Sequence, residues 1–127
     1  MHRLFLDANV LFSAAYQEDA GLRKLWSLEG AQLLTSGYAL EEARRNLASD
    51  EQRSRLARLA ADLELVPEAP SGSLPDEFDL PEKDRPIVVA AVQAEATHLV
   101  TGDLSHFGPY LGRTVAGIRF VRPAELL

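Results

Sequence analysis

Two carboxylates directly follow short apolar runs that have the composition of buried strands. Asp7 comes after Leu4-Phe5-Leu6, and Asp103 comes after Leu99-Val100-Thr101-Gly102. Open parallel sheets hold their ligands at the carboxyl ends of the strands, so we expect both acids at one edge of a sheet. Carboxylates that meet at such an edge suit the binding of a divalent cation.

Two more acids stand near the starts of predicted helices. Glu42 lies in the predicted helix over residues 38–48, for which Ser36 is the expected N-cap. Asp84 lies two residues before Pro86, which opens a further predicted helix. Because an α/β fold gathers its ligands where strands end and helices begin, the sequence directs four carboxylates toward one region.

Each of these acids also has a purely structural interpretation. Asp7 can cap the turn after its strand, and Asp103 can serve as a Gly-Asp turn residue. Glu42 follows Glu41 in a charged stretch of the kind that faces solvent, and Asp84 can favour a helix N-terminus through the dipole. If all four interpretations held together, the grouping of the acids would be a coincidence.

Apolar runs and helical periodicity alternate along the chain. Together they predict an α/β domain with a mostly parallel sheet and helices on both faces. We expect the strand order 3-2-1-4-5, in which the first and fourth strands are neighbours. The expected strands cover residues 3–6, 31–35, 63–66, 97–101 and 117–121, and the expected helices cover residues 22–28, 38–48, 50–61 and 86–94.

Two stretches are predicted to be irregular. Residues 17–21 read as a loop, and residues 67–86 hold five of the seven prolines. The predicted helix over residues 50–61 directs its leucines inward and its arginines largely to solvent, namely Arg53, Arg55 and Arg58.

Composition narrows the classes of function. The chain has 127 residues, 46% of them hydrophobic, and a formal net charge of -6, so we expect one domain over residues 1–127. No apolar stretch approaches the roughly 20 residues of a membrane helix and no secretory signal is seen, which predicts a cytoplasmic protein with no membrane contact. The lack of cysteine leaves oxygen and imidazole as metal ligands, and the acidic balance argues against nonspecific binding of nucleic acid.

Four segments together resemble the PIN domain family of metal-dependent nucleases, in particular its small stand-alone, VapC-like members from toxin-antitoxin modules. The similarity covers nearly the whole chain. The last two segments, which an Ala-rich helix separates, carry the most specific match. The segments are Phe5-Leu6-Asp7-Ala8-Asn9-Val10-Leu11, Thr35-Ser36 leading to Glu42 with Arg45 and Leu47, Lys83-Asp84-Arg85-Pro86-Ile87, and Leu99-Val100-Thr101-Gly102-Asp103 with His106-Phe107.

The resemblance implies a three-layer α/β/α fold and an RNA-cleaving site of four acids that hold Mg²⁺ or Mn²⁺. A hard divalent cation with carboxylate ligands would offset the repulsion among the acids and activate water for attack on phosphorus. This hydrolysis would leave a 5′ phosphate and a 3′ hydroxyl. The four implied catalytic and metal-binding residues are Asp7, Glu42, Asp84 and Asp103.

The resemblance also implies protein partners: a second copy of the chain and a cognate antitoxin that blocks the site. The apolar face around Leu22, Leu25 and Trp26 is either a dimer surface or, by default for such a stripe, part of the core.

Polar side chains near the acids are candidates for positioning and for substrate contact. Asn9 and Thr101 either position a carboxylate or phosphate oxygen or serve the turns they occupy. His106 is expected to make a loop contact, because the three histidines do not form a metal spacing. Three arginines either grip flanking phosphates or keep the surface soluble, namely Arg44, Arg45 and Arg85.

Three other classes of protein fit parts of the pattern. A response-regulator receiver needs a lysine near the last strand, whereas the only lysines are Lys24 and Lys83. A haloacid dehalogenase phosphatase needs an aspartate two positions after the first, where this chain has Asn9. A non-catalytic PIN domain that binds RNA or protein as a scaffold stays open, although such a module has no reason to gather four repelling carboxylates.

Overall fold

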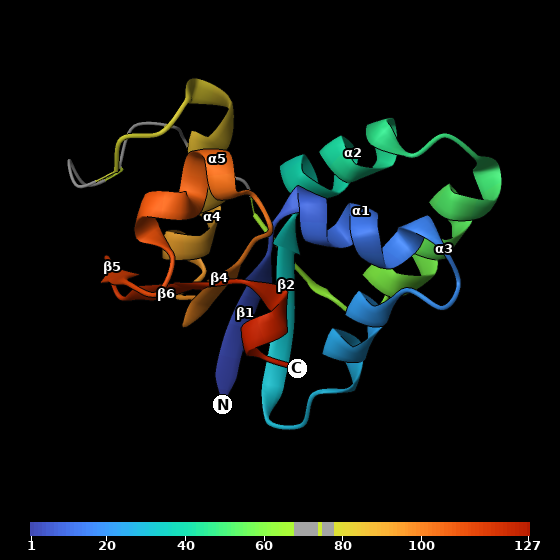
Figure 1. Ribbon diagram of the computed structural model, residues 1–127, viewed down its shortest axis with the longest axis horizontal. Helices are drawn as coiled ribbons and strands as arrows, with labels where there is room; N and C mark the ends of the chain where they lie inside the picture. The colour runs from blue at the N-terminus through green and yellow to red at the C-terminus, as the bar shows by residue number, and fades with distance from the viewer. Residues whose placement is uncertain (68–73, 75–77) are drawn as a thin grey trace.

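The computed structural model describes residues 1–67, 74 and 78–127, and its strands form one six-stranded sheet in the order β3-β2-β1-β4-β6-β5 (Figure 1). All neighbouring strands are parallel except β5 and β6. The predicted fold class is therefore confirmed. The strands are β1 (His2–Leu6), β2 (Ala31–Ser36), β3 (Glu64–Val66), β4 (His98–Val100), β5 (Thr114–Val115) and β6 (Ile118–Val121).

Helices cover both faces of this sheet. The first three helices lie together on one side, whereas the last two lie on the other (Figure 1). This division follows from the winding of the chain, which runs outward from β1 to β3 and then returns past β1 to β4. The helices are α1 (Ala8–Tyr16), α2 (Gly37–Asn46), α3 (Asp50–Ala60), α4 (Arg85–Gln93) and α5 (Leu104–Phe107).

The core lies on both faces of the central strand β1. Leu4, Phe5 and Leu6 are buried in succession, as expected for a parallel strand that is covered on two sides. Phe5 pairs in register with Leu34 of β2 and with Leu99 of β4. Because β1 lies between these two strands, its carboxyl end is held in the middle of the sheet edge.

The strand order sets the position of the acids. The predicted order 3-2-1-4-5 is correct for the five predicted strands, the fifth of which is β6. The antiparallel β5 was not predicted, because it has only two residues and follows no apolar run. It joins β6 through a tight turn at Ala116 and Gly117, whose φ angles are both positive, as a two-residue hairpin turn of type I′ requires.

One helix was not predicted, and one predicted helix has a different form. Residues 8–16 form α1, which was not predicted because the run Val10-Leu11-Phe12 lacks the polar positions of an amphipathic pattern. The predicted helix over residues 22–28 is the 3-10 helix η1 (Gly21–Ser27). Its Leu25 is fully buried and Trp26 Nε1 donates to the carbonyl oxygen of Leu59 at 3.0 Å, so this stripe packs in the core.

The arginines of α3 also differ from expectation. Only Arg58 is exposed. Arg55 is buried, and its Nε donates to the carbonyl oxygen of Ala15 at the end of α1, at 3.0 Å. Arg53 is half-buried and its Nη2 donates to the carbonyl oxygen of Leu47, at 2.6 Å. Helix C-termini leave carbonyl groups without partners, and these guanidinium groups satisfy them.

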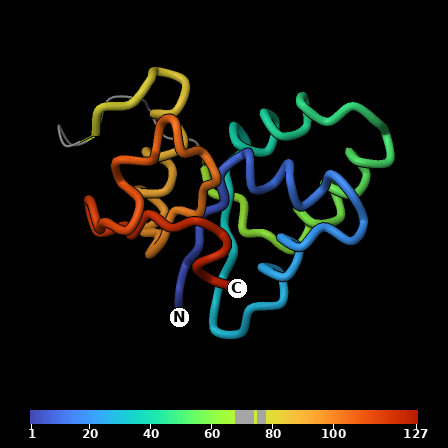
Figure 2. Tube along the Cα trace, in the orientation of Figure 1, coloured from blue at the N-terminus to red at the C-terminus, as the bar shows by residue number. Residues whose placement is uncertain are grey.

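The segment before α4 lies beside the segment after β4. Figure 2 shows the yellow part of the chain running next to the orange part, and the backbone N–H of Asp79 donates to the hydroxyl of Tyr110 at 2.7 Å. Most of the predicted irregular stretch lies outside the described residues, but its end forms the short 3-10 helix η2 (Glu82–Asp84). No helix among the described residues is long and apolar enough to cross a membrane.

Candidate active site

A cavity of about 580 Å³ opens at the carboxyl ends of the central strands. Its acids come from four different segments of the chain: the end of β1, helix α2, helix η2 and the turn after β4. The structure thus brings all four acids that were predicted from the sequence to one cavity. The lining residues are Asp7, Ala8, Asn9, Phe12, Glu42, Asn46, Lys83, Asp84 and Asp103.

Asp7 is the most deeply buried of these acids, with 5% of its surface exposed. Its Oδ1 accepts the backbone N–H of Ala8 at 2.7 Å, so Asp7 also caps α1. Its Oδ2 accepts from the Thr101 hydroxyl at 2.8 Å and from Asn9 Nδ2 at 3.1 Å. Burial raises the pKa of Asp7 to about 6, although the bonds from Thr101 and Ala8 lower it. The capping role and a place in the cavity therefore coexist in one residue.

Asn9 and Thr101 join the two strand ends. Asn9 Oδ1 accepts the backbone N–H of Gly102 at 2.8 Å, and Thr101 Oγ1 accepts the backbone N–H of Asp103 at 3.0 Å. A Cβ on Gly102 would lie 3.3 Å from Asn9 Oδ1, so the absence of a side chain permits this approach. Both polar side chains contact Asp7 and hold the turn after β4 against it.

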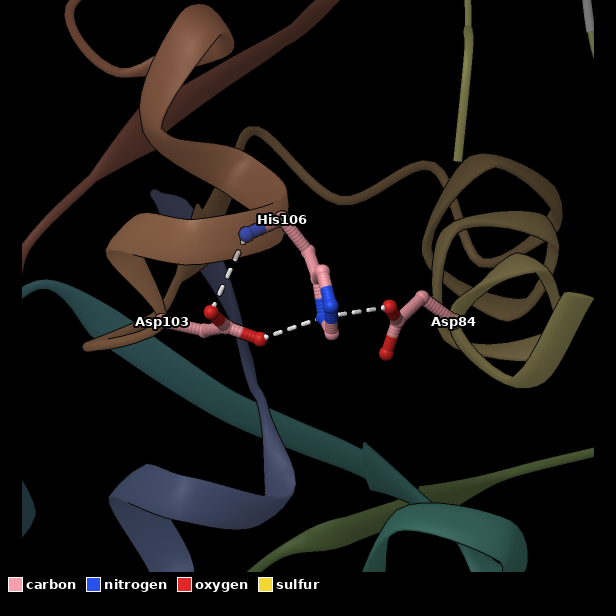
Figure 3. Close-up of side chains that lie close together, drawn as sticks. All are labelled: Asp84, Asp103 and His106. Carbon is pink, nitrogen blue, oxygen red and sulfur yellow. Dashed lines mark hydrogen bonds and ion pairs between the residues drawn. The ribbon is translucent and has the colours of Figure 1, made fainter. Parts of the chain in front are cut away.

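Asp103 caps the short helix α5 with only one of its oxygens. Oδ1 accepts the backbone N–H groups of Ser105 and His106 at 3.0 and 3.1 Å. Oδ2 lies 2.9 Å from His106 Nδ1 (Figure 3). The cap fixes the carboxylate so that its second oxygen is turned toward the imidazole.

Asp84, the last residue of η2, faces the same imidazole from the opposite side. Its Oδ2 lies 2.8 Å from His106 Nδ1, so the ring stands between two carboxylates, as Figure 3 shows. Burial raises the pKa of Asp84, and the charge of Asp103 raises it further, whereas His106 and Lys83 lower it. The expected loop contact of His106 is thus a contact with two of the predicted acids.

Helix α2 distinguishes between the two adjacent glutamates. Glu41 is exposed and forms an ion pair with Arg44, in which Nη2 and Oε1 are 2.7 Å apart. Glu42 is half-buried and lines the cavity. Successive residues on a helix point about 100° apart, so only one of the pair can face the cavity.

Several lining residues could not be identified from their sequence context. Lys83 brings a cation to the cavity rim, and Tyr38 fixes that segment by donating its hydroxyl to the Lys83 carbonyl oxygen at 2.6 Å. Phe12 and Asn46 also face the cavity, one turn after Ala8 and Glu42 respectively, a spacing that would have indicated them once α1 and α2 were placed. Among the described residues that line the cavity, no arginine is present, and Arg44 is held by Glu41.

The donor set at this cavity fits a divalent cation. Asp84 Oδ2 and His106 Nδ1 are buried, and their close contact lacks the angles of a hydrogen bond. One ligand atom from each of Asp84, Asp103 and His106 lies within 4.8 Å of the others. Carboxylate oxygens suit Mg²⁺ and Mn²⁺, and an imidazole nitrogen suits transition-metal ions. A bound cation would supply the partner that these atoms lack.

Comparisons with known proteins show which family the chain belongs to. The model of the family described as PIN domain matches residues 3–105, whereas no protein with a curated description matches the sequence. The fold is similar to a chain in the crystal structure of VapBC2 from Rickettsia felis bound to a promoter DNA fragment, with a TM-score of 0.70, 18% identity, and coverage of 94% of this chain and 98% of that one. It is also similar to a chain in the structure of FitAB bound to a DNA fragment, with a TM-score of 0.57, 15% identity and 94% coverage of each chain. The resemblance noted in the sequence is therefore confirmed, and the chain belongs to the PIN domain family.

Proposed function

We propose that this chain is a metal-dependent endoribonuclease that hydrolyses phosphodiester bonds at the cavity of four acids. The observation that carries the proposal is that four acids line one cavity, namely Asp7, Glu42, Asp84 and Asp103. The strand order brings the starts of α1, α4 and α5 together there, and three of the acids stand at these starts. A fold that needed only binding or stability would gain nothing from this repulsion. Membership in the PIN domain family, whose members are generally nucleases, supports the same conclusion.

Asp7, Asp84 and Asp103 would hold Mg²⁺ or Mn²⁺, with Glu42 completing the site. When bound, the cation supplies positive charge that would stabilise the five-coordinate phosphorus of the transition state and lower the pKa of water. Thr101 and Asn9 keep the Asp7 carboxylate oriented by donating to its Oδ2. Asp103 is oriented by the backbone of α5. These contacts fix the acids before substrate arrives, so little reorganisation is needed during the reaction.

Two residues on the rim would act on the substrate itself. Glu42 is half-buried beside the cavity, and its carboxylate would accept a hydrogen bond from the attacking water and orient it toward phosphorus. Lys83 is the cation that lines the cavity, and its ammonium group would bind a nonbridging phosphate oxygen. Attack of this water on phosphorus, from the side opposite the 3′ oxygen, would form a P–O bond and break the P–O3′ bond. The water would release a proton to solvent and the 3′ oxygen would take one up, which leaves a 5′ phosphate and a 3′ hydroxyl.

The likeness to chains from VapBC2 and FitAB supports a further part of the proposal, that this chain is the toxin of a toxin-antitoxin pair. An antitoxin would inhibit it by covering the cavity, and a homodimer would be its working form. We also propose a cytoplasmic location and one domain over residues 1–127.

The test is cleavage of end-labelled single-stranded RNAs with Mn²⁺ or Mg²⁺, with and without chelator. Wild-type protein should cut only with metal, and Asp7→Asn should lose the activity. Glu41→Gln is a control, because Glu41 is an exposed acid outside the cavity lining and should be dispensable. If the folded wild type binds the RNAs but cuts none of them, the proposal fails and the scaffold alternative replaces it.

A further inference from the structure

One imidazole nitrogen lies between two acids of the cavity. His106 Nδ1 is 2.8 Å from Asp84 Oδ2 and 2.9 Å from Asp103 Oδ2 (Figure 3). The two carboxylates come from segments about twenty positions apart in the sequence, η2 before α4 and the turn after β4. Sequence spacing alone could not place the imidazole between them.

Ordinary hydrogen bonding does not account for this arrangement. A ring nitrogen carries at most one hydrogen, so Nδ1 cannot donate fully to two carboxylates at once. The contact with Asp84 lacks the angles of a hydrogen bond, and both of its atoms are buried from solvent. Asp103 Oδ1 is already used by two backbone N–H groups, which leaves Oδ2 to face the ring. Buried polar atoms without a good partner are rare and call for an explanation.

We propose that His106 Nδ1 is a direct ligand of the divalent cation, together with Asp84 and Asp103. This inference rests on the proposed function only in taking the cavity as a cation site. Neighbouring ligand atoms around an octahedral ion with bonds of about 2.1 Å are about 3 Å apart. The two separations from Nδ1 agree with that value, and the three ligand atoms form one group. The site is then of mixed carboxylate and imidazole character.

An imidazole ligand changes which metal the site prefers. Mg²⁺ favours oxygen ligands, whereas Mn²⁺ and the later transition metals accept imidazole nitrogen more readily. A site with His106 in the coordination shell should therefore bind Mn²⁺ more tightly than Mg²⁺, and part of that preference should depend on the ring. Removing the ring should weaken Mn²⁺ binding about 10-fold or more and Mg²⁺ binding by less.

The test is electron spin echo spectroscopy of the Mn²⁺-loaded protein, without RNA, together with calorimetric titration of Mn²⁺ and Mg²⁺. Wild type should show the nitrogen modulation of a directly bound imidazole, and His106→Ala should lose it. His2→Ala is the matched control, because His2 is exposed and lies at the opposite end of β1, and it should keep the signal. Circular dichroism and thermal unfolding show whether both variants remain folded.

The wild-type spectrum decides the inference even if His106→Ala does not fold. Bound Mn²⁺ without nitrogen modulation overturns it, as does modulation that persists in folded His106→Ala or a failure of the wild type to bind Mn²⁺. RNA cleavage is read separately. Nitrogen-ligated Mn²⁺ without any cleavage contradicts the proposed nuclease alone, whereas cleavage by a protein whose Mn²⁺ has only oxygen ligands contradicts the role of His106 alone.

Discussion

Buried charged groups occur both in helix α3 and at the cavity, but their partners differ. In α3, the Arg55 guanidinium donates to carbonyl oxygens of Ala15 and Tyr16. At the cavity, Asp84 Oδ2 and His106 Nδ1 approach each other without a hydrogen bond. The first region satisfies its buried charge entirely from within the chain. The second leaves Asp84 Oδ2 and His106 Nδ1 without a hydrogen-bond partner among the described residues.

The comparison distinguishes a charged group that stabilises the fold, Arg55, from charged groups that belong to the candidate site, the acids of the cavity. Arg55 closes the C-terminus of α1, where carbonyl groups would otherwise lack partners. Burial raises the pKa of both Asp7 and Asp84, and repulsion from neighbouring acids of the cavity acts in the same direction, against hydrogen bonds to Asp7 and the charge of His106 beside Asp84. Like charges that are buried close together are unfavourable for folding, and such features are expected at functional sites.

The largest effect should come from neutralising a cavity acid. Asp84→Asn keeps the shape of the side chain but removes a ligand charge, so cleavage should fall about 1,000-fold or more. Its melting temperature without metal should stay equal or rise, because burial, the main cause of the raised pKa of Asp84, opposes the carboxylate charge, and the repulsion from Asp103 is relieved as well. Single-turnover cleavage and thermal unfolding measure the two effects. A variant that cleaved normally would remove Asp84 from the proposed site.

In helix α3, the corresponding change should affect stability and not catalysis. Arg55→Ala leaves the carbonyl groups of Ala15 and Tyr16 without their donor, and the free energy of unfolding should fall by about 3 kcal/mol. Denaturant unfolding gives the value, and cleavage per folded molecule should be unchanged. Arg58→Ala is the control, because Arg58 is an exposed arginine of the same helix and should change stability little.

The parts of the fold that the sequence predicted are those encoded by local patterns. The five longer strands and their order were predicted, because buried parallel strands are short continuous apolar runs. Helix α1 was not, since it is nearly as apolar as the strand before it and packs against α2 and α3. Strand β5 has two residues, too few for a periodic pattern.

The candidate site likewise has residues that local sequence patterns predict and contacts that depend on the tertiary structure. Asp7 and Asp103 were predicted because strand ends are visible in the sequence. Glu42 was chosen over Glu41 on the family resemblance alone, since the local pattern does not show how α2 is rotated against the sheet. His106 reaches Asp84 only because η2 and α5 lie side by side, and no local pattern indicates that contact.

The burial of Asp7 at the cavity should make stability depend on pH in the absence of metal. The raised pKa of Asp7, about 6 against an ordinary 3.8, means that the folded chain binds this proton more tightly than the unfolded chain. The contribution of Asp7 to the free energy of unfolding should therefore be most favourable below about pH 4. It should decline by about 2 to 3 kcal/mol as the pH rises from there through about 6. Denaturant unfolding in chelator across pH 4 to 7.5 measures this loss.

Asp7→Asn provides the control for that measurement. Asparagine does not titrate, so the decline between pH 4 and 6 should become shallower even if the variant is less stable overall. Mn²⁺ should offset the loss in wild type, because a bound cation favours the charged carboxylates. An Asp7→Asn profile as steep as that of wild type would assign the pH dependence to other groups.

The smallest expected effect distinguishes two buried threonines with similar bonds. Thr101 donates its hydroxyl to Asp7 Oδ2, whereas Thr35 donates its hydroxyl to the backbone carbonyl oxygen of Leu6. Each change to valine removes one buried hydrogen bond and should lower the free energy of unfolding by about 1 to 2 kcal/mol. Only Thr101→Val should also raise the pKa of Asp7, because the lost bond favours the charged carboxylate.

The pH at which metal-free protein loses stability should therefore shift upward in Thr101→Val and stay constant in Thr35→Val. Unfolding curves of the two variants in chelator at several pH values measure that shift. Equal profiles would show that the Thr101 hydroxyl serves only the fold, as the Thr35 hydroxyl does. A selective shift would show that the chain holds the charged form of Asp7 ready for a cation, at the one strand end where burial opposes that charge most strongly.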